Sequence, residues 1–256
     1  MDIKKFFAEY DAQSKILSDD ELEKMLTDAC LSYPNEKPED FSGLSALYNE
    51  LGAFYRARQI LDKAEDAFLK AKLFLERNVT ETVEFDTGNF ACCCSGGTTK
   101  GQVETNVDLR NTLDYATTIN NLAELYRMKG EAVQALNMFT TAKDIYSKIE
   151  KVPEEVLASC YNNMGMAHLD LKCPQPAGEC FEEALKLLDG SSNHFLLGTT
   201  TSNLGFAHLL SGDLAGAGVK MQAAAQHFLQ SGGAEDQMYK ACMGMYEKIA
   251  AKLDQQ

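Results

Sequence analysis

A pattern of small and aromatic residues occurs four times along this chain and restricts the folds open to it. Each copy places a large apolar residue before a small one: Leu51-Gly52, Leu122-Ala123, Met164-Gly165 and Leu204-Gly205. A ring follows three residues after the small one: Tyr55, Tyr126, His168 and His208. An alanine stands twelve residues after the small residue: Ala64, Ala135, Ala177 and Ala217. This period predicts stacked copies of one unit, because a single unit cannot bury its own apolar face.

Together these residues resemble the tetratricopeptide repeat, a helix-turn-helix unit. Ala123, Gly165 and Gly205 are 42 and 40 residues apart, similar to the longer units of kinesin light chain and of many bacterial proteins like it. The resemblance covers residues 42 to 230. It implies an all-α fold, a right-handed α-solenoid in which the first helix of each unit lines a concave groove. It also implies a protein-protein interaction adaptor and not an enzyme.

The repeat spacing divides the chain into seven parts. They are a helical pair at 1-33 that forms a degenerate repeat or a cap, repeat 1 at 39-77, an inserted loop at 78-110, repeat 2 at 111-150, repeat 3 at 153-190, repeat 4 at 193-231 and a capping helix at 235-256. The insertion is rich in Gly, Thr, Asn and β-branched residues, which predicts a long loop that can include a short hairpin around Gly96-Gly97.

Asparagines recur on the first helix of the repeats. With about 100° of rotation per residue, they turn away from the packing residues of each copy. In the kinesin light chain class this face is the groove, and asparagines matching Asn121, Asn163 and Asn203 hold bound peptides. We predict a peptide-binding surface from this phase: Asn49, Thr117, Asn120, Asn121, Glu124, Arg127, Asn162, Asn163, Met166, Asn203 and Phe206.

The chemistry of the side-chain amide supports this prediction. An amide donates and accepts, so it can pair with the C=O and N-H of an extended peptide. The helix cost of each Asn, roughly 0.6 kcal/mol relative to Ala, is small beside a net 0.5 to 1.5 kcal/mol per hydrogen bond. The alternative is that the amides bridge neighbouring helices and bind nothing. Towards the C-terminus the same face becomes apolar, and unless a ligand or the last helix covers it we expect exposed side chains there: Met166, Leu169, Phe206, Leu209 and Leu210.

The net charge indicates the kind of partner. At -14, with a pI near 4.7, the chain does not match nucleic acid or an anionic membrane surface, both of which attract clustered Lys and Arg. A neutral or basic extended protein segment fits better. The start, MDIKKFFAEYDAQSK, has no secretory pattern, and no run approaches the roughly 20 apolar residues of a membrane span. We therefore expect a cytoplasmic protein without a cofactor.

Cysteine and histidine offer alternative sites. Four of the eight cysteines lie in apolar helical patterns: Cys30, Cys160, Cys180 and Cys242. The adjacent Cys92, Cys93 and Cys94 in the insertion leave open a thiol-based metal or redox site carried by the repeats. Self-association through the apolar end of the groove is a further alternative. His168 and His208 are predicted to pack in the core, and His194 and His227 to be isolated.

Overall fold

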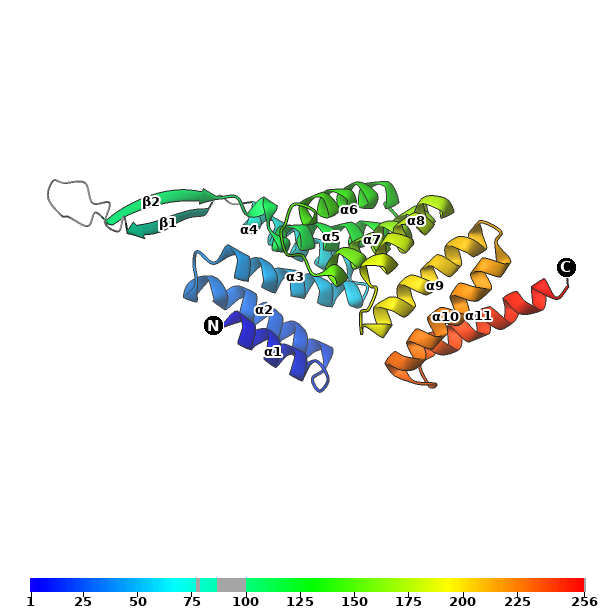
Figure 1. The fold of residues 1–256 in the computed structure, drawn as a ribbon. Coiled ribbons are helices and arrows are strands. Elements are labelled where there is room, and N and C mark those ends of the chain that lie inside the picture. The colour runs from blue at the N-terminus through cyan, green and yellow to red at the C-terminus, as the bar shows by residue number, and fades with distance from the viewer. Residues whose placement is uncertain (77–78, 87–99, 256) are drawn as a thin grey trace, which may run out of the picture. The chain divides into compact units, whose positions relative to one another are not determined.

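The computed structural model describes residues 1–76, 79–86 and 100–255, and within them the chain forms eleven α-helices and one pair of strands (Figure 1). The helices are α1 (Ile3–Gln13), α2 (Asp19–Glu36), α3 (Phe41–Ala57), α4 (Leu61–Leu75), α5 (Leu113–Met128), α6 (Ala132–Tyr146), α7 (Glu154–Asp170), α8 (Pro174–Leu187), α9 (His194–Leu210), α10 (Leu214–Gly232) and α11 (Gln237–Leu253). The strands are β1 (Val79–Asp86) and β2 (Lys100–Val107), followed by a 3-10 turn at Leu109–Asn111.

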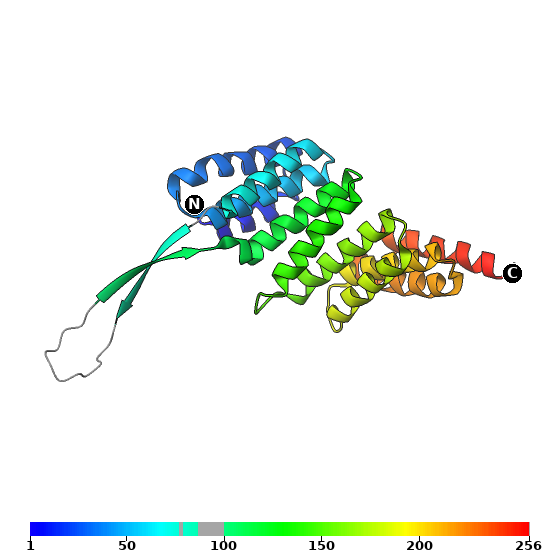
Figure 2. The ribbon, with the colours of Figure 1, turned by 90° about the horizontal axis from the view of Figure 1, so that it is seen from above.

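The chain divides into two compact units, which are described separately. The N-terminal unit is Met1–Tyr115, and the C-terminal unit is Ala116–Gln256. In each unit the helices pack as consecutive antiparallel pairs, such as α3 with α4 and α9 with α10, and α11 packs against α10 (Figures 1 and 2). No helix in the described ranges is both long and apolar enough to span a bilayer.

The recurring small residue explains how the two helices of a pair come together. A Cβ atom added at Gly165 would lie 2.5 Å from the ring of Phe181, and one added at Gly52 would lie 2.5 Å from the ring of Phe68. Both phenylalanine side chains are completely buried. In these two pairs, the glycine leaves space on the first helix because it has no side chain. An aromatic ring from the second helix occupies that space.

The turn inside each pair also recurs, seven residues after the small residue. The residue there has a positive φ in all four copies: Gln59 (63°), Gly130 (86°), Lys172 (61°) and Gly212 (84°). Glycine adopts this conformation at little cost, whereas Gln59 and Lys172 carry a Cβ atom into it. The turn geometry is thus kept by the packing of the pair even where the sequence does not favour it.

The insertion between α4 and α5 is not a long loop over its described residues. Strands β1 and β2 pair antiparallel, from Val79 opposite Val107 to Asp86 opposite Lys100. The prediction of a long loop was wrong for these residues, although part of each segment alternates β-branched and polar residues, which is the pattern of a strand. Gly96-Gly97, around which a short hairpin was predicted within the loop, lies outside the described residues.

The two ends of the insertion are tied together within the N-terminal unit. The Tyr115 hydroxyl, at the start of α5, donates to the Glu76 carboxylate at 3.0 Å, just after α4 ends. Lys72 pairs with the same carboxylate at 2.5 Å. Burial and the adjacent Glu76 raise the pKa of Tyr115 to about 12, so its hydroxyl stays a donor at neutral pH. We call this group the insertion clamp.

Candidate functional site

The predicted groove residues lie mainly on the first helices of the C-terminal unit, α5, α7 and α9. Asn49 is the exception, since it lies on α3 of the N-terminal unit. Asn162 is buried and Phe206 is exposed, while the others are half-buried: Asn49, Thr117, Asn120, Asn121, Glu124, Arg127, Asn163, Met166 and Asn203. The name amide row is used below for Asn120, Asn121, Asn162, Asn163 and Asn203.

One pair in the amide row is closed. The side-chain amide of Asn203, on α9, donates to Oδ1 of Asn162, on α7, at 3.0 Å. Asn121 also has an interaction partner within the chain, and the Thr117 hydroxyl accepts a hydrogen bond from Tyr146 at 3.2 Å. Between α7 and α9 the amides therefore bridge neighbouring helices, which was the alternative to peptide binding.

The equivalent pair one repeat earlier is open. Asn163 and Asn120 stand at the repeat positions of Asn203 and Asn162, yet among the residues that the structure describes neither makes a side-chain hydrogen bond. Oδ1 of Asn120 is also inaccessible to solvent. A buried acceptor without a donor costs about 1 to 3 kcal/mol. This position of the amide row therefore has hydrogen-bonding capacity that the fold does not use.

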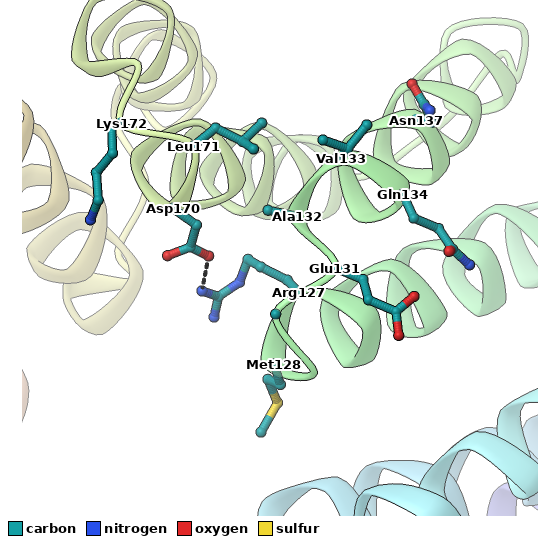
Figure 3. Close-up of a pocket in the computed structure, with 11 residues that line it drawn as sticks. Arg127, Met128, Glu131, Ala132, Val133, Gln134, Asn137, Asp170, Leu171 and Lys172 are labelled. Atoms are coloured by element: carbon teal, nitrogen blue, oxygen red, sulfur yellow. Dashed lines mark hydrogen bonds and ion pairs between the residues drawn. The ribbon is translucent and has the colours of Figure 1, made fainter.

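Seven residues after Asn120 on α5, Arg127 joins two helices through three charged hydrogen bonds. Its guanidinium contacts both Glu124 oxygens at 2.9 Å, and it reaches Oδ2 of Asp170, at the end of α7, at 2.9 Å (Figure 3). The Arg127 and Glu124 side chains are only 18% and 19% exposed. The two carboxylates raise the pKa of Arg127, so it remains charged. We call these three residues the Arg127 cluster.

The Arg127 cluster borders an open cleft of about 990 Å³ between two turns of the C-terminal unit (Figure 3). We call it the turn cleft, and its lining comes from the α5–α6 turn, the start of α6 and the α7–α8 turn: Arg127, Met128, Gly130, Glu131, Ala132, Val133, Gln134, Asn137, Asp170, Leu171 and Lys172. Only Arg127 among the predicted site residues lines it. The sequence signal that could have located the other lining residues is the recurring turn position, because Gly130 and Lys172 occupy the same place in successive repeats and both line the cleft.

At the other end of the C-terminal unit the groove face is apolar, although less of it is exposed than predicted. Phe206 and Leu210 on α9 are 39% and 56% exposed, as expected. Leu169 is only 9% exposed, because it packs in a cluster with Phe181 and Leu204. Met166 is partly buried against the same cluster, and Leu209 packs against the cluster formed by α10 and α11. The prediction of exposure was therefore wrong for Leu169, which lies at the edge of the stripe.

Histidines 194 and 227 are not isolated. Their rings stack between α9 and α10 with centroids 5.8 Å apart. Nδ1 of each ring is buried without a partner within the described chain. Burial, together with the nearby His194, lowers the pKa of His227. This contact could not be predicted from the sequence, because the two residues lie on different helices and at positions outside the repeat signature.

We expect this pair to make the stability of the chain depend on pH. Because the folded-state pKa of His227 is lowered, its contribution is complete above the unfolded value near 6.5 and is lost as the pH falls below it. Urea unfolding at pH 7.5 and pH 5.5 should show a smaller loss of stability for His227→Gln than for the wild type. The half-buried His168 also has a lowered pKa, so some dependence should remain. Identical losses in both proteins would contradict the prediction.

The described cysteines are free thiols, and four of the five are buried or half-buried. Cys30, Cys160 and Cys242 are buried, Cys180 is half-buried, and Cys173 is exposed. Burial raises the pKa of Cys30 and Cys160 to about 12 and that of Cys180 to about 11, which makes them poor nucleophiles at neutral pH. Cys92, Cys93 and Cys94 lie outside the described residues. Within the described part, no group of three or more candidate side chains is arranged to hold a metal ion.

Comparison with known proteins agrees with this architecture. A family model described as Tetratricopeptide repeat matches residues 114–189. BtubC (BKLC) from P. vanneervenii is 18% identical over 91% of this chain and 82% of its own, with a TM-score of 0.67. A putative kinesin light chain from P. anserina, with nearly identical TPR-like repeats, is 12% identical over 90% and 96%, with a TM-score of 0.59.

A third similar structure is a signal transduction ATPase of the STAND class with a tetratricopeptide repeat sensor, from Pyrococcus horikoshii. It is 16% identical over 89% of this chain and 29% of its own, with a TM-score of 0.62. No curated protein matches the chain. The prediction of an all-α repeat fold is confirmed, with the hairpin β1–β2 as an addition. Residues 114–189 therefore match the tetratricopeptide repeat family, and the chain has an α-solenoid fold similar to that of kinesin light chain-like repeats.

Proposed function

We propose that this protein is a non-enzymatic adaptor that binds an extended segment of another protein along the groove face of α5, α7 and α9. Solenoids of this kind form extended concave surfaces that bind other proteins. The contact residues of the proposal are those predicted from helical phase on these three helices, except Asn162 and Asn203, which are bonded to each other. The five free thiols of the described chain support a reducing compartment, and we propose the cytoplasm.

The open amide pair is the observation that carries this proposal. Asn162 and Asn203 satisfy each other, whereas Asn120 and Asn163 at the equivalent positions do not. If Asn120 turns towards the groove, a peptide N-H can donate to its Oδ1, and the Asn163 amide can pair with the same main chain. Binding then removes the cost of an unpaired acceptor and adds a net 0.5 to 1.5 kcal/mol per hydrogen bond.

The test uses a displayed library of random 12-residue peptides selected on the full-length protein. We expect Asn120→Ala/Asn163→Ala to retain selected peptides about tenfold less than the wild type, because two main-chain hydrogen bonds are lost. The measurement is the affinity of the three most enriched peptides for each protein. The fold should be unaffected, because the variant also removes the unpaired buried oxygen of Asn120.

The closed pair supplies the matched control. Asn203→Ala removes the donor to Asn162, and Asn162 is buried. We expect this variant to lower the free energy of unfolding by about 1 to 3 kcal/mol while it keeps the peptide affinity within about threefold. Equal affinity of the wild type and Asn120→Ala/Asn163→Ala for every selected peptide would refute the groove proposal.

A further inference from the structure

The groove face of the C-terminal unit changes from charged to apolar between α5 and α9. Helix α5 contributes Glu124 and Arg127 to this face, and α7 contributes Asp170 at its end. Helix α9 contains no Asp, Glu, Lys or Arg over its whole length, His194–Leu210. A peptide segment lying across the three helices therefore meets a charged surface at one end and an apolar surface at the other. Its two ends must carry different kinds of side chain.

The charged end has an excess of carboxylates. Arg127 is shared between Glu124 and Asp170, so one of these two negative charges is not balanced by it. In the turn cleft beside them, Glu131 and Lys172 are both exposed and offset each other in charge. The Asp170 side chain is 40% exposed, so it is the carboxylate of the Arg127 cluster that is most accessible to a partner. A cation brought by a partner is the group that complements this end.

The apolar end has two large side chains with little cover. Phe206 and Leu210 follow Asn203 at intervals of three and seven residues, which places all three on one side of α9. Phe206 is 39% and Leu210 is 56% exposed, although the neighbouring Leu204 and Ala207 are buried. Since Asn203 is already bonded to Asn162, this end offers apolar area more than hydrogen bonds. It suits a large apolar side chain.

The distance between the two ends follows from helix packing. Neighbouring packed helices lie about 8 to 10 Å apart, and the Arg127 cluster joins α5 to α7 whereas Phe206 and Leu210 lie on α9. The separation is thus one and a half to two helix spacings, about 12 to 20 Å. An extended chain covers about 3.3 Å per residue, so this distance corresponds to about four to six residues.

We propose that the bound segment carries a Lys or Arg four to six residues away from a Leu, Met or Phe. The cation lies over the Arg127 cluster, and the apolar side chain lies on Phe206 and Leu210. The open amide pair holds the main chain between these contacts. This inference rests on the proposed function, because it specifies which segments that groove accepts.

The test is the sequence content of the peptides selected from the random 12-residue library on the full-length protein. We expect the pair of a basic and a large apolar residue, at a separation of four to six, to be enriched at least tenfold over the unselected library. Selection on Phe206→Ser/Leu210→Ser should abolish the apolar preference and keep the basic one. Selection on Asp170→Asn should do the reverse, with at least a threefold loss of basic residues.

The outcomes separate this inference from the proposed function. If peptides are enriched and need Asn120 and Asn163, but show no such spacing, the inference is wrong and the groove proposal stands. If no peptide is enriched above the library, both are wrong. If the peptide-free wild type dimerises in light scattering and Phe206→Ser/Leu210→Ser does not, the apolar end belongs to a second copy of the chain, and the inference is overturned.

Discussion

Replacing Phe181 by alanine is expected to lower the free energy of unfolding of the chain by about 3 to 5 kcal/mol. The side chain is completely buried, and its ring fills the site left by Gly165 between α7 and α8. It also packs with Leu169 and Leu204, so the cavity would open into the contact between successive repeats. Urea unfolding followed by circular dichroism measures the change.

Phe195→Ala is the matched control for this substitution. The same residue type lies at the start of α9 with 56% of its surface exposed, and its ring meets Phe228 edge to face at 6.0 Å. We expect a loss of about 1 kcal/mol or less, since little apolar area is removed from the interior. Comparable losses for Phe181→Ala and Phe195→Ala would show that the recurring aromatic residue does not hold the repeat pair together.

Replacing Arg127 by methionine is expected to cost about 2 kcal/mol of stability. Removing one partner of a fully buried ion pair costs about 3 to 5 kcal/mol, and the cost is smaller here because Asp170 is 40% exposed and keeps part of its hydration. Glu124, at 19% exposed, loses both of its charged hydrogen bonds to Arg127. The same urea experiment gives the change, and a thermal scan gives the accompanying fall in Tm.

Arg110→Met provides the comparison for a solvated pair. Arg110 also contacts both oxygens of a carboxylate, that of Asp108, but their side chains are 56% and 45% exposed. Ion pairs of this kind contribute about 0 to 1 kcal/mol. If Arg110→Met and Arg127→Met have equal effects, then burial does not strengthen the Arg127 cluster, and its role in the charged end of the groove would need another explanation.

The repeat architecture could be predicted from the sequence because its cause is periodic. Gly165 faces Phe181 as Gly52 faces Phe68 and Gly205 faces Met221, so the spacing between these residues reports the contact. The turn position is equally periodic, although Gln59 and Lys172 adopt it without being glycine. A contact that recurs between repeats requires similar residues at the same position of each copy, so the pattern becomes recognisable when the copies are aligned.

The site was harder to predict because its features differ between repeats. Helical phase places Asn120 and Asn162 alike, yet one is unpaired and the other accepts from Asn203, and a rule about phase cannot separate them. The stacking of His194 on His227 depends on how two particular helices meet. Leu169 was assigned to the groove by phase, but at the edge of a stripe the neighbouring repeat decides between exposure and burial.

The insertion clamp has a consequence for how such a chain can acquire new parts. Because Glu76 and Tyr115 bring the two ends of the insertion together, the segment between them leaves and returns at almost one point. Its length and sequence are thereby uncoupled from the helical register on either side. A junction of this kind allows a repeat protein to exchange one attached module for another without redesigning its core.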